Sequence, residues 1–236
     1  MPKIIFFDTE TTGNTEKDFL CQIAYKDNNV TFTGLYKPPI KIPPEASAVH
    51  HISNKMIENR PSFKESGDLP KIKELLENSI VVAHNASFDL MIVKKEGIEP
   101  QKFICTLRVA RHLDKEEKIE RYNLQYLRYL LDIEIDATAH DAMGDVLVLE
   151  QLYERLKKKM MAEEKLNEDE AVEKMMEISS HPSLIRTLNF GKYKGKKVEE
   201  VLQIDRGWME WLLGEKEKSD QIDEDWIYTL RHYLGK

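Results

Sequence analysis

FDTETTG, residues 7–13, places two acids, Asp8 and Glu10, directly after a short apolar run. A continuous apolar run of this length predicts a buried β-strand. Because side chains at positions i and i+2 of a strand point to the same face, we expect the two carboxylates to lie together where the strand ends. Like charges this close favour a raised pKa for one acid or the recruitment of a hard divalent cation. A pair of solvated acids in a turn is the alternative for this motif alone.

Strand patterns continue through the first third of the chain, and helical patterns follow. Alternating apolar residues at 19–25, a turn at 27–29 and the stretch VTFTGLY predict a β-hairpin. Apolar residues at 142, 146, 149, 153 and 156 form a helical stripe. Asn167 followed by Glu170 has the spacing of a capping box and predicts a further helix. Strands followed by helices that alternate with more strands predict a mixed α/β domain.

Composition limits the class of protein. The 236 residues are long enough for one substantial domain with a small appendage, and 41% of them are hydrophobic. The two cysteines, Cys21 and Cys105, lie far apart, so we expect neither a disulfide framework nor a structural zinc site. A reducing, cytoplasmic location is the expectation that follows. No stretch approaches the length of a membrane span, so we expect no membrane partner.

The charge distribution matters more than the net charge of −7. An acidic surplus argues against a polyanionic partner, because phosphate binding usually requires a basic surface. However, FGKYKGKK, residues 190–197, contains four lysines and no acid. Two aromatic side chains lie among these lysines, a composition that suits contact with a phosphate backbone and with bases. A solvated turn with core aromatics explains the same stretch equally well.

Two further stretches carry acids near the start of a predicted helix. Asp89 ends HNASFD, which follows the apolar stretch IVVA, and Asp145 ends HDAMGD, which begins with His140. Five residues along a helix correspond to a rotation of about 500°. His140 and Asp145 therefore reach one site only if His140 lies in the loop before the helix.

DTETTG, HNASFD and HDAMGD, in this order, resemble the motifs of the DEDDh family of 3'-5' exonucleases. FGKYKGKK and GWMEWLL are similar to the small C-terminal domain of the exodeoxyribonuclease X group within that family. The resemblance implies a ribonuclease-H-like mixed β-sheet flanked by helices. It further implies an exonuclease domain over residues 1–159, a helical linker over 160–182, and a small domain over 183–236 that contacts nucleic acid.

The resemblance also implies the site. It assigns Asp8, Glu10, Asp89 and Asp145 to two Mg²⁺ ions, for which Mn²⁺ would substitute, and it places His140 and Glu10 among the catalytic residues. Two ions about 3.5–4 Å apart bind the attacking water, the scissile phosphate and the leaving oxygen together. With an unperturbed pKa of about 6.5, His140 suits the role of general base near neutrality.

Residues expected to contact the nucleic acid come from the first motif, a proline-flanked loop, the second motif and the lysine-rich stretch. They are Thr9, Thr11, Thr12, Glu45, His50, Asn85, Lys192 and Lys194. His84 and Asn85 are also expected to shape the loop that presents Asp89.

Three functions fit these sequence features. The first is a magnesium-dependent exonuclease that removes 5'-mononucleotides from the 3' end of DNA, in DNA repair. The second is an exoribonuclease that trims RNA 3' ends, because no residue is identified that recognises a 2'-hydroxyl. The third is a proofreading subunit that docks on a polymerase through residues 183–236.

Overall fold

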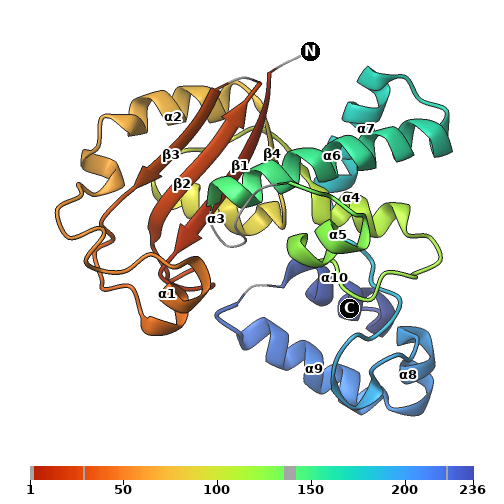
Figure 1. Ribbon diagram of the computed structural model, residues 1–236. Helices are drawn as coiled ribbons and strands as arrows, with labels where there is room; N and C mark the ends of the chain where they lie inside the picture. The colour runs from red at the N-terminus through yellow and green to blue at the C-terminus, as the bar shows by residue number, and fades with distance from the viewer. Residues whose placement is uncertain (1–2, 29, 136–141, 222) are drawn as a thin grey trace. The chain divides into compact units, whose positions relative to one another are not determined.

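The computed structural model describes residues 3–28, 30–135, 142–221 and 223–236. Within these ranges the N-terminal part contains a five-stranded mixed sheet in the order β3-β2-β1-β4-β5 (Figure 1). β1 pairs antiparallel with β2 and parallel with β4, and β4 pairs parallel with β5. The expected hairpin is confirmed, because β2 and β3 pair antiparallel. The strands are Ile4–Thr11 (β1), Leu20–Asp27 (β2), Val30–Leu35 (β3), Ile80–Ala83 (β4) and Lys102–Cys105 (β5).

Helices flank this sheet, so the predicted fold class, a ribonuclease-H-like mixed sheet with flanking helices, is confirmed. The α-helices are Pro44–His50 (α1), Asp68–Glu77 (α2), Ala86–Lys95 (α3), Thr106–Leu113 (α4), Leu124–Leu130 (α5), Ala142–Glu164 (α6), Glu168–Ser179 (α7), Val198–Ile204 (α8), Arg206–Lys218 (α9) and Glu224–Leu234 (α10). Short 3₁₀ turns occupy Phe63–Glu65 (η1) and Gly191–Tyr193 (η2).

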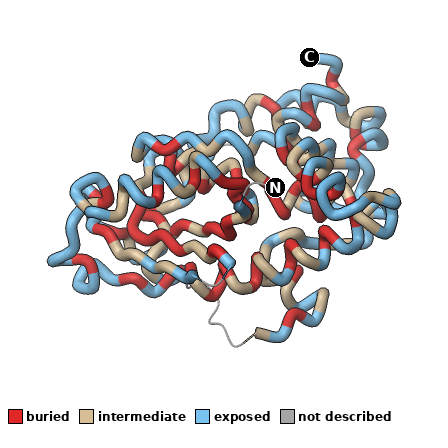
Figure 2. The backbone as a smooth tube through the Cα atoms, turned by 90° about the horizontal axis from the view of Figure 1, so that it is seen from above, coloured by how far each residue is buried: buried red, intermediate tan, exposed pale blue. Residues whose placement is uncertain are grey.

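Strand β1 contacts helices on both faces of the sheet, because its side chains alternate between the faces. Phe7 is fully buried in a cluster with Ile72 of α2 and Ile92 of α3. Phe6 points the other way and packs edge-on against Tyr153 of α6, with ring centroids 5.4 Å apart. Buried residues accordingly follow the central strands (Figure 2). The two faces of β1 therefore belong to different helices, and this decides which side chains can meet at its end.

The helix predicted from residue 142 is α6, which continues past Lys159 to Glu164. The predicted capping box is confirmed at the start of α7, where Asn167 and Glu170 each accept from the other's backbone amide. Near the end of α7, the Ser179 hydroxyl accepts a hydrogen bond from the Cys105 amide at 2.8 Å. The Ser179 carbonyl accepts from Arg108 at 2.7 Å. These buried bonds connect α7 to β5 and α4.

The chain divides into two compact units. Unit one comprises residues 1–113 and 121–180, and unit two comprises residues 114–120 and 181–236. The stretch expected as a linker, 160–182, is thus mostly the end of α6 and the whole of α7, both within unit one. The reason is burial, since Ala171 and Met175 of α7 are fully buried.

Unit two has a hydrophobic core of its own. Its buried residues come from α8, α9, α10 and the segment before them: Leu188, Val198, Val201, Met209, Leu212, Leu213, Trp226, Leu230 and Leu234. The segment 114–120 joins this unit through Glu117, which accepts from the Thr187 hydroxyl at 2.6 Å and pairs with Lys197. Unit two therefore meets the criterion of a small domain with a separate core.

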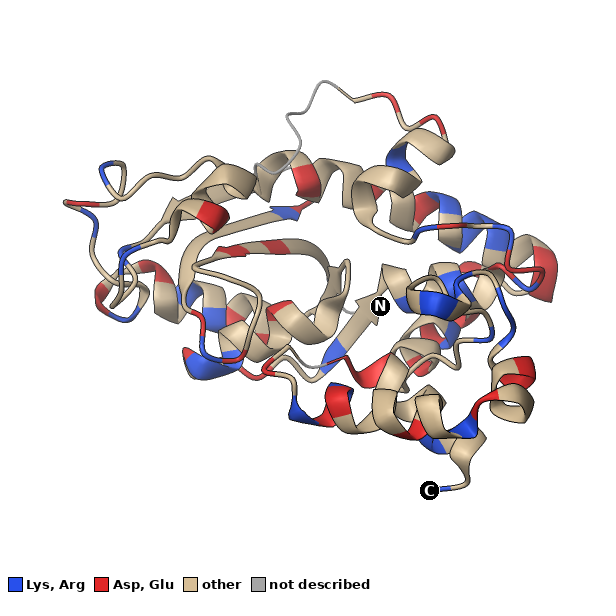
Figure 3. Cartoon of the chain, turned by 90° about the horizontal axis from the view of Figure 1, so that it is seen from below, with Lys and Arg blue, Asp and Glu red and all other residues tan. Residues whose placement is uncertain are grey.

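Within the described ranges, no helix has the length and apolar character needed to cross a bilayer. Basic and acidic residues are interspersed over the helices (Figure 3).

Candidate metal centre

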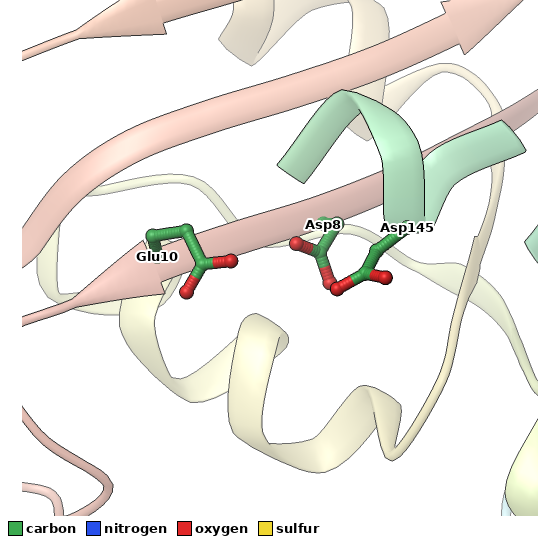
Figure 4. A group of neighbouring side chains, drawn as sticks. All are labelled: Asp8, Glu10 and Asp145. Atoms are coloured by element: carbon green, nitrogen blue, oxygen red, sulfur yellow. The ribbon is translucent and has the colours of Figure 1, made fainter. Parts of the chain in front are cut away.

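Three carboxylates meet at the end of β1. Asp8 and Glu10 lie on the same strand face as Phe6, which is the face covered by α6. Asp145 lies in the first turn of α6. One oxygen from each of the three side chains lies within 4.8 Å of the other two, and Figure 4 shows the side chains side by side. Strand parity and the start of one helix are therefore sufficient to gather three of the four predicted ligands.

Gln125 of α5 fixes the third carboxylate. Its side-chain amide donates to Oδ1 of Asp145, as the chemistry requires, because an ionised carboxylate only accepts hydrogen bonds. α5 is held at its start by Asn123, whose side chain accepts from the Tyr126 amide at 2.8 Å. Among the described residues, Gln125 Oε1 is buried without a hydrogen-bond partner. No motif identified Gln125; the helix-capping pattern of Asn123 was the one signal in the sequence nearby.

Asp89 takes a different position. Its Oδ1 accepts from the Thr9 amide at 3.0 Å and from the Thr9 hydroxyl at 2.7 Å. Thr9 lies between Asp8 and Glu10 and points to the α3 face of the sheet, so Asp89 on α3 reaches Thr9. Among the described residues, the three-carboxylate group does not include Asp89.

The environment of Asp89 changes its acidity. The side chain is 4% exposed. Burial raises the pKa of Asp89 to about 7, although the two hydrogen bonds from Thr9 act in the opposite direction. This carboxyl therefore changes its charge near neutral pH, and a nearby cation would favour the ionised form.

The three threonines of the first motif are buried, and their hydroxyls have partners within the protein. Thr9 donates to Asp89, and Thr12 donates to Asp18 Oδ1 at 2.8 Å. Thr11 donates to the Gly13 carbonyl. The pairing of β1 with β2 shifts register immediately after Glu10, which marks a β-bulge. These hydroxyls and the bulge thus shape the strand end that presents the acids.

The other predicted contacts lie in separate environments. Glu45 is exposed on α1, whereas His50, at the end of that helix, is buried. The His50 Nδ1 accepts from the Ile52 amide at 3.0 Å, and burial lowers the pKa of His50. Asn85 is exposed and adopts a left-handed conformation, with φ of 62°, at the start of α3. His140 lies outside the described residues.

His84 fixes the loop before α3. The His84 Nε2 contacts the Tyr122 carbonyl at 2.6 Å, so this nitrogen carries the proton. The Nδ1 lies 2.9 Å from the Thr106 hydroxyl and accepts its proton. Burial, followed by the nearby Arg111 charge, lowers the pKa of His84 to about 4. The ring therefore connects three segments of unit one in its neutral form.

The two lysines predicted to bind substrate differ in their surroundings. Lys192 forms an ion pair with Asp205 at 2.8 Å. Lys194 is exposed, and it has no ion pair among the described residues. Both belong to unit two, whereas the three-carboxylate group belongs to unit one.

Comparison with known families gives two matches. Residues 5–153 match the family described as "Exonuclease", and residues 188–217 match the family described as "Exodeoxyribonuclease X-like C-terminal". The first match contains all four predicted metal ligands and covers more than half of the chain. The second covers the lysine-rich stretch, α8 and most of α9.

Individual relatives agree with these matches. Exodeoxyribonuclease 10 of Escherichia coli is 29% identical over 201 residues, which are 85% of this chain and 83% of that protein. DNA polymerase III subunit epsilon of Treponema pallidum is 31% identical over 160 residues, 62% of this chain and 73% of that protein. Among solved structures, exonuclease X in complex with 5' overhanging duplex DNA has a TM-score of 0.58 at 24% identity and covers 75% of this chain and 99% of that one. At this identity the structural match supports the fold.

Proposed function

Because the chain belongs to the exonuclease family, we propose that it hydrolyses DNA phosphodiester bonds from the 3' end and releases 5'-mononucleotides. The observation that carries this proposal is the meeting of Asp8, Glu10 and Asp145 within 4.8 Å at the end of β1. DNA is the preferred substrate in this proposal because exodeoxyribonuclease 10 of Escherichia coli, a relative that aligns over 85% of this chain and 83% of its own length, is named for DNA.

The side chains at the end of β1 suit a divalent cation. All the candidate ligand atoms are carboxylate oxygens, the ligands preferred by hard cations such as Mg²⁺. Mg²⁺ keeps several positions of its shell for water and phosphate, so few protein ligands are needed. We assign Asp8, Glu10 and Asp145 to this role. Asp89 enters the proposal as the fourth acid of a two-ion site only through the family resemblance, since in the structure it binds Thr9 and lies outside the three-carboxylate group. Mn²⁺ is expected to substitute, because it also prefers oxygen ligands.

The chemistry divides between the bound ions and the protein. Divalent ions held here would lower the pKa of a bound water and neutralise charge on the scissile phosphate. The protein positions the acids: Gln125 orients Asp145, and Thr9 orients Asp89. His140 is the proposed general base that takes the proton of the attacking water. The loop position that its role requires falls in the segment outside the described residues.

The direct test uses single-stranded DNA labelled at its 5' end. We expect stepwise shortening with Mg²⁺ or Mn²⁺ and none with EDTA. Asp145→Asn should lower the rate by at least about a hundredfold, because it removes charge from the ion site while keeping the shape of the side chain. Glu58→Gln, a matched change at an exposed acid, should have no effect. DNA that stays intact at several pH values with either metal would overturn the proposal.

A matched RNA strand in the same assay decides between the two nucleic acids. Faster shortening of RNA than of DNA would assign the chain to RNA trimming instead. A cytoplasmic location, argued from the separated cysteines, remains a prediction.

A further inference from the structure

The lysine-rich stretch of unit two forms a loop that backbone hydrogen bonds close. Leu188 and Lys196 bond across it, with the Leu188 amide 2.9 Å from the Lys196 carbonyl. The Gly195 amide donates to the Leu188 carbonyl at 2.7 Å. Gly191 and Gly195 have φ of 68° and 85°, which favour glycine. A Cβ at Gly191 would lie 3.4 Å from the Trp208 ring, so this backbone runs against that ring.

Asp205 binds two side chains of this loop and so stabilises its conformation. Its carboxylate accepts from Lys192 at 2.8 Å and from the Tyr193 hydroxyl at 2.7 Å. The other oxygen of Asp205 accepts from the Trp208 amide at 3.0 Å and caps α9. Phe190 packs edge-on against Trp226, with centroids 5.1 Å apart. Lys192, Tyr193 and Phe190 therefore hold the loop on the core.

Three aromatic side chains in and beside this loop form a row, and the last ring of the row is exposed to solvent. The Tyr193 ring lies 5.0 Å from the Trp208 ring, which lies 6.4 Å from the ring of Trp211. Trp211 is 57% exposed, an unusual position for so large an apolar side chain. Lys194 follows Tyr193 directly in the chain. Lys194 and Lys196 are exposed, and neither has an ion pair among the described residues.

We infer that Trp211, Lys194 and Lys196 form a holding site for single-stranded DNA on unit two. This inference rests on the proposed function. An exposed indole offers a flat face to a base, and unpaired lysines offer charge to the adjoining phosphates. Stacking tolerates any base, so the site takes DNA without sequence preference. Lys192 also lies next to this aromatic row, but it pairs with Asp205 and stabilises the loop instead of being available for DNA.

Intrinsic fluorescence tests the site directly, because all three tryptophans of the chain lie in unit two. The full chain is titrated with an oligothymidylate in EDTA, which prevents hydrolysis. We expect the tryptophan emission to be quenched as the DNA binds. Trp211→Phe should remove most of this quenching while it retains a ring that stacks. Emission that stays unchanged at saturation would overturn the inference.

Affinity measured by anisotropy of a labelled oligothymidylate gives a second readout. Trp211→Ala should raise the dissociation constant about tenfold. The double change Lys194→Ala and Lys196→Ala should lower the slope of log affinity against log salt by about 1.4. Matched controls in the same unit are Tyr228→Ala, which is 43% exposed, and Lys218→Ala with Lys236→Ala. Equal losses in the controls would show a general charge or surface effect and refute the site.

Failure of the inference and failure of the proposed function are separable. Hydrolysis of a thymidine monophosphate nitrophenyl ester by the wild-type chain with Mg²⁺ reports on the metal centre without a DNA strand to hold. Hydrolysis with no quenching and with wild-type affinity in the variants would reject the holding site alone. Absence of hydrolysis would reject the proposed function, whatever the fluorescence shows.

Discussion

Gln125 is the residue whose role depends most on the tertiary structure. Its side-chain amide donates a hydrogen bond to one oxygen of Asp145, which fixes the orientation of this carboxylate in the three-carboxylate group. Side chains that orient metal ligands typically contribute tenfold or more to metal affinity. The hydrogen bond from Gln125 is therefore expected to affect ion binding before it affects the fold.

We expect Gln125→Leu to weaken Mg²⁺ or Mn²⁺ binding about tenfold, because the Asp145 carboxylate loses its fixed orientation. Isothermal titration calorimetry with the metal alone measures this without turnover. Gln151→Leu, at an exposed glutamine of α6, is the matched control. If both variants bind the metal as the wild type does, Gln125 has no positioning role.

From the lowered pKa of His84 we predict that the free energy of unfolding depends on pH. The folded pKa of His84, about 4, lies below the ordinary value of 6.5. Between these values the unfolded chain binds a proton that the folded chain does not, so the free energy of unfolding decreases as the pH falls from 6.5 to 4. The slope from one such group is at most about 1.4 kcal/mol per pH unit.

His84→Gln removes the titrating group, and we expect urea unfolding across that pH range to show a shallower slope in the variant. The variant should be less stable at neutral pH, because the Thr106 hydroxyl loses the closer of its two acceptors and keeps only the Ala83 carbonyl at 3.3 Å. Parallel curves for the two proteins would contradict the assignment of the neutral form to His84.

At the scale of elements, α7 depends on its last residue for attachment to unit one. Ser179 is fully buried and bonds to the Cys105 amide, whereas the adjacent Ser180 is exposed and bonds within its own helix. Ser179→Ala would remove the acceptor of this hydrogen bond from the buried Cys105 amide. We expect Ser179→Ala to lower the free energy of unfolding by about 1–3 kcal/mol and Ser180→Ala to change it by less than about 0.5 kcal/mol, both in chemical denaturation. Equal effects would show that the buried bond is not what attaches α7.

At the scale of the whole molecule, the two units have separate hydrophobic clusters. Domains with separate cores can unfold in separate steps. Tryptophan emission reports unit two alone, while far-ultraviolet circular dichroism reports both units. We expect the denaturation midpoints from the two signals to differ. Coincident curves that fit one transition would show that the units unfold as one.

Local patterns predicted much of this architecture. The hairpin, the helix from residue 142 and the capping box at Asn167 follow from side-chain periodicity and from turn and cap chemistry, which act over a few residues. The family resemblance, carried by three short motifs, is confirmed by the match over residues 5–153. The sequence did not predict that α7 belongs to unit one. Most residues of α7 are polar or charged, and only a narrow face that includes Ala171 and Met175 is buried.

The sequence by itself determined that Asp8 and Glu10 point the same way, because the two-residue period of a strand is a property of the backbone. It also determined the family and the order of the elements. Only the tertiary structure decided that Asp145 joins this pair while Asp89 binds Thr9, since α6 and α3 cover opposite faces of β1. The tertiary structure also decided which lysine of unit two is paired, because Asp205 forms an ion pair with Lys192. Which groups meet across helices depends on packing between segments far apart in the chain, and no local pattern carries that information.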